Sequence, residues 1–221
     1  MILLNAVDPK AIEPAVKKAK AAGIVVVAVD VAAAGADATV QTNNVQAGQI
    51  ACDFLAKKLN GKGNVVIMMG DLANNSTRGR TAGVKEVLAK YPDIKIVEEQ
   101  TANFERTKAI DLMSNWISKG DKIDAVASNN DEMAIGAIIA LQQAGLSPKK
   151  IFVGGVDATP DALAEMQKGN LAVTVFQNAK GQGERSLDDA VRMIKGEKVQ
   201  QFDFIPYELV TPENYKTFLN R

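Results

Sequence analysis

The sequence predicts an α/β protein built on parallel sheets, and two observations support this fold class. Strand-like apolar runs alternate with helix-like segments along the chain without a break, and turn residues separate them. The apolar runs are also continuous rather than apolar at every second position. Continuous runs are typical of strands in a parallel sheet that is covered on both faces.

The predicted elements follow one another in a regular order. Strands are expected at Ile2–Val7, Ile24–Asp30, Asn64–Met69, Ile94–Thr101, Ile123–Ser128, Ile151–Val156 and Leu171–Gln177. Helical periodicity predicts helices at Pro9–Ala22, Asn44–Leu59, Thr77–Lys90, Glu105–Lys119, Asp131–Ala144, Pro160–Lys168 and Ala179–Lys195. The joins carry the turn residues Gly23, Asn60-Gly61, Gly120, Gly145 and Gly169-Asn170.

The composition excludes several classes of function. The 221 residues include 26 Lys+Arg and 26 Asp+Glu, so the formal net charge is zero, which argues against a nucleic-acid-binding surface. There is no histidine, which removes the usual general base and the commonest zinc ligand. The single cysteine, Cys52, cannot form an internal disulfide and lies in a helical pattern, where a small buried apolar residue is expected.

No membrane span, cofactor site or metal site is predicted. No apolar run approaches the roughly 20 residues of a transmembrane helix, and the N-terminus lacks the basic start of a signal peptide. No glycine-rich phosphate-binding motif is present, and Gly154-Gly155 is expected to permit close backbone approach within a strand. Asp157, Asp161 and Glu165 do not have the spacing of metal ligands, because Asp157 ends a strand and Asp161 suits the first turn of a helix.

Polar residues gather where the predicted strands end. Ligands of such folds bind beyond the carboxyl ends of the strands. The residues found there are Asp30, Asn103, Phe104, Asn129, Asn130, Asp157 and Gln177, together with Arg78 and Arg80 at the start of the helix after Asn64–Met69. Amides, carboxylates, an arginine fork and one aromatic ring suit a small polyhydroxylated ligand and supply no obvious catalytic pair.

Four segments in order resemble the periplasmic sugar-binding proteins of the ribose-binding type. They are RGRTAGVKEVL (78–88), ANFERTKAIDLM (102–113), NNDEMAIGAIIALQQAG (129–145) and VGGVDATPDALAEMQKGNLAVTVFQ (153–177). The resemblance covers nearly the whole chain. It implies two Rossmann-like lobes with parallel sheets, the type I periplasmic binding protein fold, which close around a sugar by hinge motion.

The resemblance also implies a set of ligand-binding residues. Carried over position by position, they fall on Asp30, Arg80, Phe104, Asn130, Asp157 and Gln177. The carboxylates would accept hydroxyl protons, the arginine would donate a fork, and the amides would do both. The phenyl ring would cover the apolar face of the sugar.

The sequence departs from the family pattern in two places, one of which concerns the identity of the ligand and the other the completeness of the first lobe. Ribose binders usually carry an arginine after the first aspartate, where this chain has Val31. This departure favours another pentose, an inositol or a small polyol. The family also begins with strand–helix–strand–helix before the strand that opens this chain, so the first lobe is expected to be incomplete: the chain is a fragment or a truncated gene product, or a second chain completes the lobe.

The family's crossovers predict the lobe boundaries. They would fall near Thr42–Asn43, Gln177–Asn178 and Ile205–Tyr207. The incomplete N-terminal lobe is then 1–42 plus 178–206, and the C-terminal lobe is 43–177 plus 207–221.

Structural roles compete with ligand contact at several of these residues. Asn130 or Asp131 can cap the following helix, with Glu132 in its first turn, and we expect Asp131 and Glu132 to serve the helix start and Asn130 the ligand. Thr159, followed by Pro160, can cap the next helix and leave Asp157 for the ligand. Trp116 is expected to pack in the core.

Three functions remain to be distinguished. The leading hypothesis is a non-enzymatic solute-binding component that delivers a sugar or polyol to an ABC-type permease, periplasmic by resemblance. The alternative is the effector domain of a LacI-type regulator, which would need a helix-turn-helix that is not present in this sequence. A glycoside hydrolase using Asp30 and Asp157 is disfavoured, because no histidine and no nucleophile–base pattern accompanies them.

Overall fold

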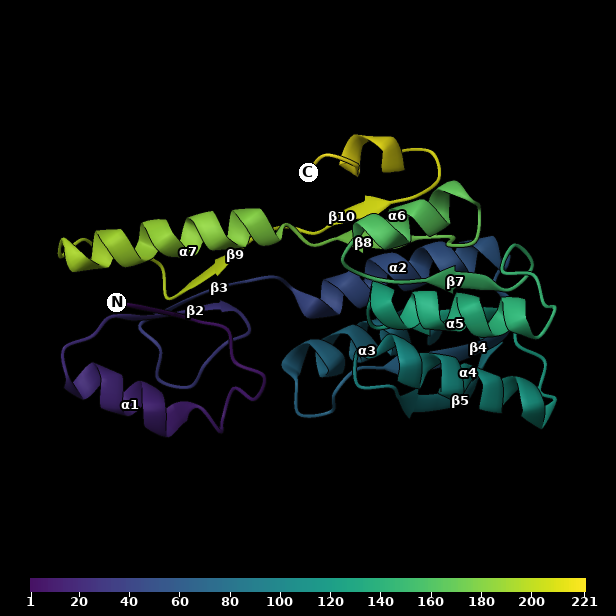
Figure 1. Ribbon diagram of the computed structural model, residues 1–221, viewed down its shortest axis with the longest axis horizontal. Coiled ribbons are helices and arrows are strands. Elements are labelled where there is room, and N and C mark those ends of the chain that lie inside the picture. The colour runs from purple at the N-terminus through teal and green to yellow at the C-terminus, as the bar shows by residue number, and fades with distance from the viewer. The chain divides into compact units, whose positions relative to one another are not determined.

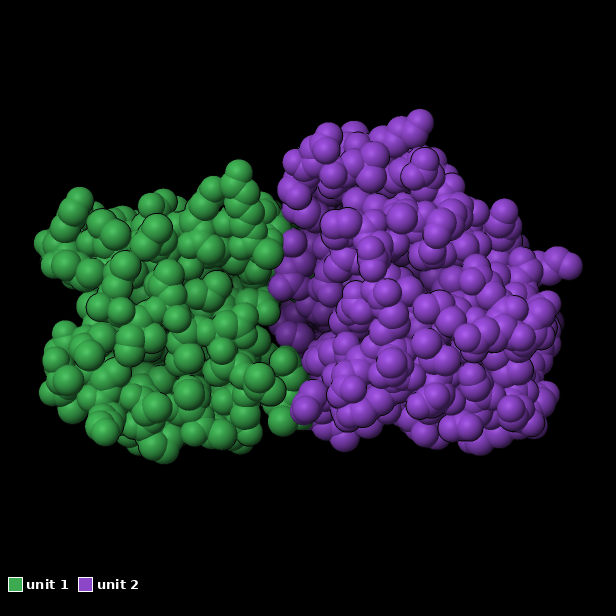
Figure 2. All heavy atoms as spheres, in the orientation of Figure 1, with its two compact units in different colours: residues 1–43, 73–75, 178–207 green, residues 44–72, 76–177, 208–221 purple.

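The computed structural model describes residues 1–221 and confirms the predicted α/β fold with parallel sheets (Figure 1). The chain forms two compact units, coloured separately in Figure 2. Unit 1 comprises residues 1–43, 73–75 and 178–207, and unit 2 comprises residues 44–72, 76–177 and 208–221. Whether these units act as ligand-binding lobes stays a prediction.

Unit 1 is a four-stranded sheet with one helix on each face. The strand order is β1-β2-β3-β9 and all pairs are parallel, with β1 at Ile2–Leu4, β2 at Val26–Asp30, β3 at Ala38–Gln41 and β9 at Phe202–Phe204. Helix α1 (Glu13–Ala21) packs Val16 against Val26 and Ala28, and helix α7 (Ala179–Ile194) packs Ala190 on the opposite face against Val27. Alternate residues of β2 therefore point to opposite helices, as the strand period requires.

Unit 2 is a larger sheet between two helical layers. The parallel order is β5-β4-β6-β7, with β4 at Lys62–Met69, β5 at Asp93–Thr101, β6 at Ala125–Ser128 and β7 at Phe152–Gly154. Two isolated parallel bridges continue the order from β7 to the segment of β8 (Thr174–Phe176), which pairs antiparallel with β10 (Glu208–Val210). The carboxyl ends of β4 to β8 therefore share one edge.

The two faces of this sheet have separate cores. One core joins Val66, Met68 and Val126 to helices α4 (Arg106–Lys119), α5 (Asp131–Gln143) and α6 (Pro160–Gln167). It contains Trp116, which is 1% exposed, so the prediction that this ring packs in the core is confirmed.

The other core joins Val65 and Ile67 to helices α2 (Asn44–Lys58) and α3 (Asn75–Leu88). Cys52 is 1% exposed there, as predicted. Helices α2 and α3 approach so closely that a Cβ on Gly83 would stand 2.0 Å from the backbone oxygen of Val45. Only glycine fits such a contact without displacing a helix, so Gly83 allows α2 and α3 to pack this closely.

The structure differs from the sequence prediction mainly in short strands. Strands β3, β9 and β10 are not predicted, because these short segments do not lie in longer apolar runs, as the equally short strands β1, β6, β7 and β8 do. The prediction for Pro9–Ala22 is too long, since α1 begins only at Glu13, and α3 starts two residues before the predicted Thr77. None of the helices combines the length and the hydropathy that crossing a bilayer requires.

Candidate functional site

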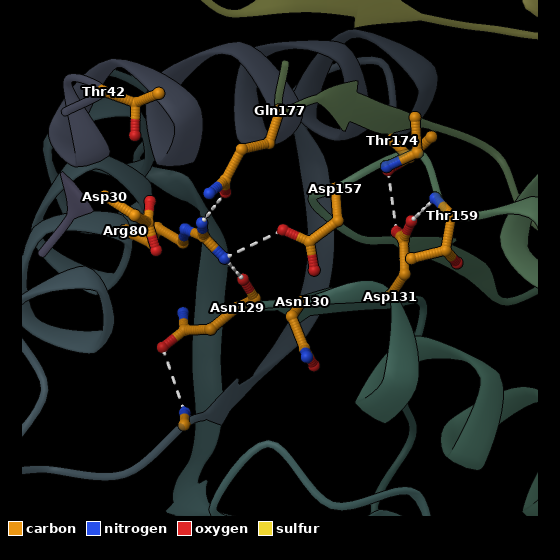
Figure 3. A network of polar contacts seen from close by, with 12 residues as sticks. Asp30, Thr42, Arg80, Asn129, Asn130, Asp131, Asp157, Thr159, Thr174 and Gln177 are labelled. Carbon is orange, nitrogen blue, oxygen red and sulfur yellow. Dashed lines mark hydrogen bonds and ion pairs between the residues drawn. The ribbon is translucent and has the colours of Figure 1, made fainter. Parts of the chain in front are cut away.

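Polar side chains gather at the carboxyl edge of the sheet in unit 2 (Figure 3). Of the predicted ligand residues, Phe104 follows β5, Asn130 follows β6, Asp157 follows β7 and Gln177 follows β8. Arg80 joins them from the first half of α3. The structure thus brings five of the six predicted residues to one unit, while Asp30 belongs to unit 1.

Arg80 lies at the centre of the polar network. Its side chain is 5% exposed. Nη1 donates to the backbone oxygen of Asn129 at 2.8 Å and to Oδ1 of Asp157 at 3.5 Å, and Nη2 donates to Oε1 of Gln177 at 2.6 Å (Figure 3). A planar guanidinium can satisfy such divergent acceptors at once, which a lysine ammonium cannot do in the same geometry. Arg78, the other candidate on this helix, is exposed and donates to the backbone oxygen of Leu72.

Asp157 occupies a strained backbone position. Its φ is 122° and that of Ala158 is 55°, in the region that favours glycine. Such conformations cost about 1–3 kcal/mol each and persist only where surrounding contacts impose them. Because the Asp157 side chain remains 28% exposed beside Arg80, its carboxylate can accept a hydrogen bond from a ligand.

Asp131 lies behind this strained segment and is completely buried. Its Oδ1 accepts from the hydroxyl of Thr174 at 2.7 Å and its Oδ2 accepts from the backbone nitrogen of Thr159 at 2.9 Å. Burial, and secondly the negative charge of Asp157, raise the pKa of Asp131 well above its usual range, although Thr174, Thr159 and Arg80 act in the opposite direction. The prediction that Asp131 serves the start of its own helix is wrong, because its carboxylate holds the loop after β7.

Asn130 performs the capping role that was assigned to its neighbours. It is 8% exposed, its backbone is extended, and its Oδ1 accepts from the backbone nitrogen of Met133 at 3.0 Å. A backbone N–H can only donate, so the amide oxygen must face Met133 and Nδ2 lies on the other side of the group. Glu132 lies in the first turn of α5, as predicted, and its carboxylate accepts two hydrogen bonds from Arg106. Thr159 caps α6 with Pro160 in its first turn, as predicted.

Phe104 is held by a glycine and a strained turn. Asn103 and Phe104 have φ of 54° and 63°. A Cβ on Gly70, the residue after β4, would stand 2.1 Å from the Phe104 ring, so the ring lies where only glycine leaves room for it. The half-buried ring also packs against the core under α4 and α5.

Asn129 is a site residue that the resemblance did not select, although its strand-end position indicated it. It is 1% exposed, and its Oδ1 accepts from the Gly70 nitrogen and from the Thr81 hydroxyl, both at 3.2 Å. Its backbone oxygen holds Arg80 at the same time. Asn129 therefore connects the end of β4, the helix α3 and the arginine.

In unit 1, Asp30 ends β2 with φ of 65°, and its Oδ1 accepts from Nε2 of Gln182 on α7 at 3.2 Å. The next residue, Val31, is 1% exposed. Three of the six predicted ligand residues, Asp30, Phe104 and Asp157, thus have a positive φ, and strained backbone of this kind is concentrated at functional sites.

The unit 2 edge carries groups that can recognise hydroxyl groups. It presents carboxylate acceptors, amide groups that both donate and accept, and a guanidinium fork near an aromatic ring. No group of three His, Cys, Asp or Glu side chains is arranged to hold a metal ion. A parallel α/β sheet with such an edge is typical of proteins that bind small ligands.

The comparison with protein families agrees with this description. The family described as "Periplasmic binding protein domain" matches residues 1–198, and the chain belongs to this family. It is 46% identical over 225 residues to a putative rhizopine-binding protein of Rhizobium meliloti, covering 98% of this chain and 73% of that protein. It is 36% identical to a xylitol-binding protein of Mycolicibacterium smegmatis, covering 96% of this chain and 61% of that protein.

Solved structures show the same fold. An ABC transporter solute-binding protein of Bacillus halodurans with bound myo-inositol is 41% identical, with a TM-score of 0.94 over 99% of this chain and 77% of that one. A solute-binding protein of Actinobacillus succinogenes with bound D-allose is 31% identical, with a TM-score of 0.93 over 98% of this chain and 79% of that one. The resemblance to sugar-binding proteins of this family, and the type I fold that it implied, are confirmed.

Proposed function

We propose that this protein is the solute-binding component of an ABC-type uptake system in the periplasm and that it binds a small polyol or monosaccharide. The observation that carries the proposal is the buried Arg80 fork, which joins Asp157, Gln177 and Asn129 at the carboxyl edge of unit 2. A site built to pair with hydroxyl groups selects for them, because a ligand without them leaves buried polar groups unpaired.

In the proposed site, four side chains surround the hydroxyl groups. Asp157 accepts, Arg80 donates, and Asn130 and Gln177 do both, while Phe104 covers an apolar face of the ring. Asp30 of unit 1 stays a predicted ligand residue on the basis of the resemblance. The permease is the proposed protein partner.

A cyclic polyol is the ligand class that we favour over ribose. The solved relative with bound myo-inositol is 41% identical to this chain, whereas the ribose import binding protein of Salmonella typhimurium is 35% identical. Val31, in the place of an arginine that ribose binders usually carry, is consistent with this preference. The LacI-type alternative has no support among the relatives described above.

Calorimetric titration with myo-inositol, xylitol, D-ribose and D-allose tests the proposal. We expect reversible saturable binding with myo-inositol at least as tight as D-ribose, and no chemical change of the ligand after long incubation. Arg80→Lys keeps the charge and loses the fork, so it should weaken binding by about tenfold or more.

Arg78→Lys is the matched control, because Arg78 lies two residues away on the same helix and is exposed. It should bind as the wild-type protein does. Equal affinities of the two variants would contradict the proposed role of Arg80, and the absence of binding to all four compounds would contradict the proposed ligand class.

A further inference from the structure

The loop after β7 presents Asp157, and each of its backbone N–H groups has a separate acceptor. The nitrogen of Asp157 donates to the backbone oxygen of Val175 at 2.8 Å. The nitrogen of Ala158 donates to Oγ1 of Thr174 at 3.2 Å, and the nitrogen of Thr159 donates to Oδ2 of Asp131 at 2.9 Å. Two of these three acceptors are side chains, so the loop depends on particular residues rather than on sheet pairing alone.

The two side-chain acceptors form one unit. The hydroxyl of Thr174 donates to Oδ1 of Asp131 at 2.7 Å while it accepts from Ala158 (Figure 3). Asp131 therefore acts on both N–H groups, one directly and one through Thr174. Both side chains are fully buried, at 0% exposure each, so water does not compete for these bonds.

Asp131 can approach this loop because Gly155 has no side chain. A Cβ on Gly155 would stand 2.3 Å from Oδ1 of Asp131. The backbone nitrogen of Asp131 also donates to the oxygen of Val156 at 2.8 Å, so the start of α5 is fastened to the same loop. The segment from 155 to 159 is thus shaped around a single carboxylate.

The conformation held in this way is the strained one. Asp157 and Ala158 both have positive φ, and neither is glycine. Released from these bonds, the segment would relax toward negative φ, which would turn the Asp157 carboxylate away from Arg80. A buried carboxylate close to a second one is also a costly way to hold a loop, because burial and Asp157 both disfavour its ionised form. Stability alone does not account for its presence.

We propose that Asp131 is a positioning residue of the binding site, which holds residues 157–159 in the strained conformation that presents Asp157 to the ligand. The inference rests on the proposed function, in which Asp157 contacts the ligand. Asp131 itself is fully buried and makes no ligand contact. Its effect passes through the backbone of the loop.

The first test needs no ligand. Residue-resolved amide hydrogen exchange is measured on the full chain for the wild type, Asp131→Ala and Asp131→Asn. In Asp131→Ala, the amides of Ala158 and Thr159 should exchange about tenfold faster or more, because their acceptors are lost or released. The amide of Ala172, which donates to the Val153 oxygen at 2.8 Å outside this loop, is the internal control and should not change.

Asp131→Asn is the conservative variant. Its amide oxygen can still accept from Thr159, and its Nδ2 can donate to Thr174, so exchange should stay within about threefold of the wild type. Thr174→Val and Thr174→Ser form a second pair that removes or keeps the hydroxyl, and they give the same measurement if Asp131→Ala does not fold. Unchanged exchange of Ala158 in both Asp131→Ala and Thr174→Val overturns the proposal.

The second test is a double-mutant cycle on affinity for myo-inositol, xylitol or D-ribose, whichever binds most tightly. Asp131→Ala should weaken binding about tenfold in the wild-type background and have no further effect once Asp157 is alanine. If the losses of binding free energy in the two single variants added up fully in the double variant, Asp131 would not act through Asp157, and the inference would be overturned. If Asp157→Ala alone leaves affinity unchanged, the assignment of Asp157 in the proposed function fails, and the exchange data still decide whether Asp131 holds the loop.

Discussion

Two substitutions at Asn130 should separate helix capping from ligand binding. Oδ1 of Asn130 accepts from the Met133 nitrogen at 3.0 Å in a position that is 8% exposed, while Nδ2 takes no part in this bond. Asn130→Ala removes both groups, and Asn130→Ser keeps a side-chain oxygen that can cap. The loss of the cap should lower the free energy of unfolding by about 1 kcal/mol in the alanine variant and by a few tenths at most in the serine variant.

Ligand affinity should follow a different pattern from stability. Both variants lack the Nδ2 donor, so both should leave a ligand hydroxyl without its partner and lose about 1–3 kcal/mol of binding free energy, which is roughly a 5- to 150-fold weaker Kd. Urea unfolding followed by fluorescence of the single Trp116, which is buried in unit 2, gives the stability of each variant. Calorimetry with myo-inositol gives the affinity.

The outcomes are separable because the two roles use different atoms. Wild-type affinity in Asn130→Ser would refute the ligand role and leave the cap. Wild-type stability in Asn130→Ala would refute the cap. Equal losses of stability in both variants would mean that the amide is needed for packing rather than for the hydrogen bond to Met133.

Three further predictions concern stability and reactivity. Gly83→Ala should lower the free energy of unfolding by about 2 kcal/mol or more, because the added Cβ would lie 2.0 Å from a backbone oxygen. Gly183→Ala, where the added Cβ meets nothing within 4 Å, should raise the free energy of unfolding by up to about 1 kcal/mol, because alanine has the higher helix propensity. Chemical denaturation measures both changes. Burial raises the pKa of the Cys52 thiol to about 12, so at pH 8 an aromatic disulfide reagent should label it roughly a thousandfold more slowly in the folded than in the unfolded chain. Burial, and secondly Asp203, raise the pKa of Asp189, so its contribution to stability is present at low pH and is lost as pH rises above about 4. Asp189→Asn should therefore gain stability relative to the wild type as pH rises above about 4, and the gain should level off once pH exceeds the pKa of Asp189 in the folded protein.

The sequence was sufficient for the centre of the unit 2 sheet because its central strands lie in continuous apolar runs. Strands β4 and β6, for example, are buried on both faces, and their continuous runs identify them without knowledge of their partners. Helix α6 was predictable for a local reason, since Thr159 and Pro160 form a start signal that lies wholly within the sequence. Features fixed by neighbours in the sequence could be predicted in this way.

The missed strands depend on partners far away in the chain. Strand β9 pairs Phe202 with Thr39, and β10 pairs Glu208 with Phe176. Neither segment lies in a longer apolar run that would predict a strand, and the pairing of each is decided by tertiary structure. Strand β3 has the same difficulty, with four residues after the glycine-containing turn at Gly35.

Within the site, the role of Asp131 could not be predicted for the same reason, because its partners lie far away in the chain. An acidic residue at the start of a helix has a ready local explanation as a cap, which is why the sequence predicts that role for Asp131. Its actual partners are Thr159 and Thr174, which lie 28 and 43 residues further along the chain. The one signal in the sequence was the Gly154-Gly155 pair, which correctly indicated close approach but did not show what approaches.

The strained residues show what the sheet scaffold contributes to the site. Of the six non-glycine residues with positive φ, only Asn60 lies away from the strand ends where ligand residues are predicted. The contacts at two of these turns come from the same unit: Gly70 and Thr101 lie against the Asn103–Phe104 turn, and Asp131 holds the Asp157 loop. If strain at these positions serves ligand geometry, Ala158→Gly, which relieves it and keeps the Asp157 carboxylate, should stabilise the fold while it weakens binding, whereas a purely structural origin would leave affinity tied to stability.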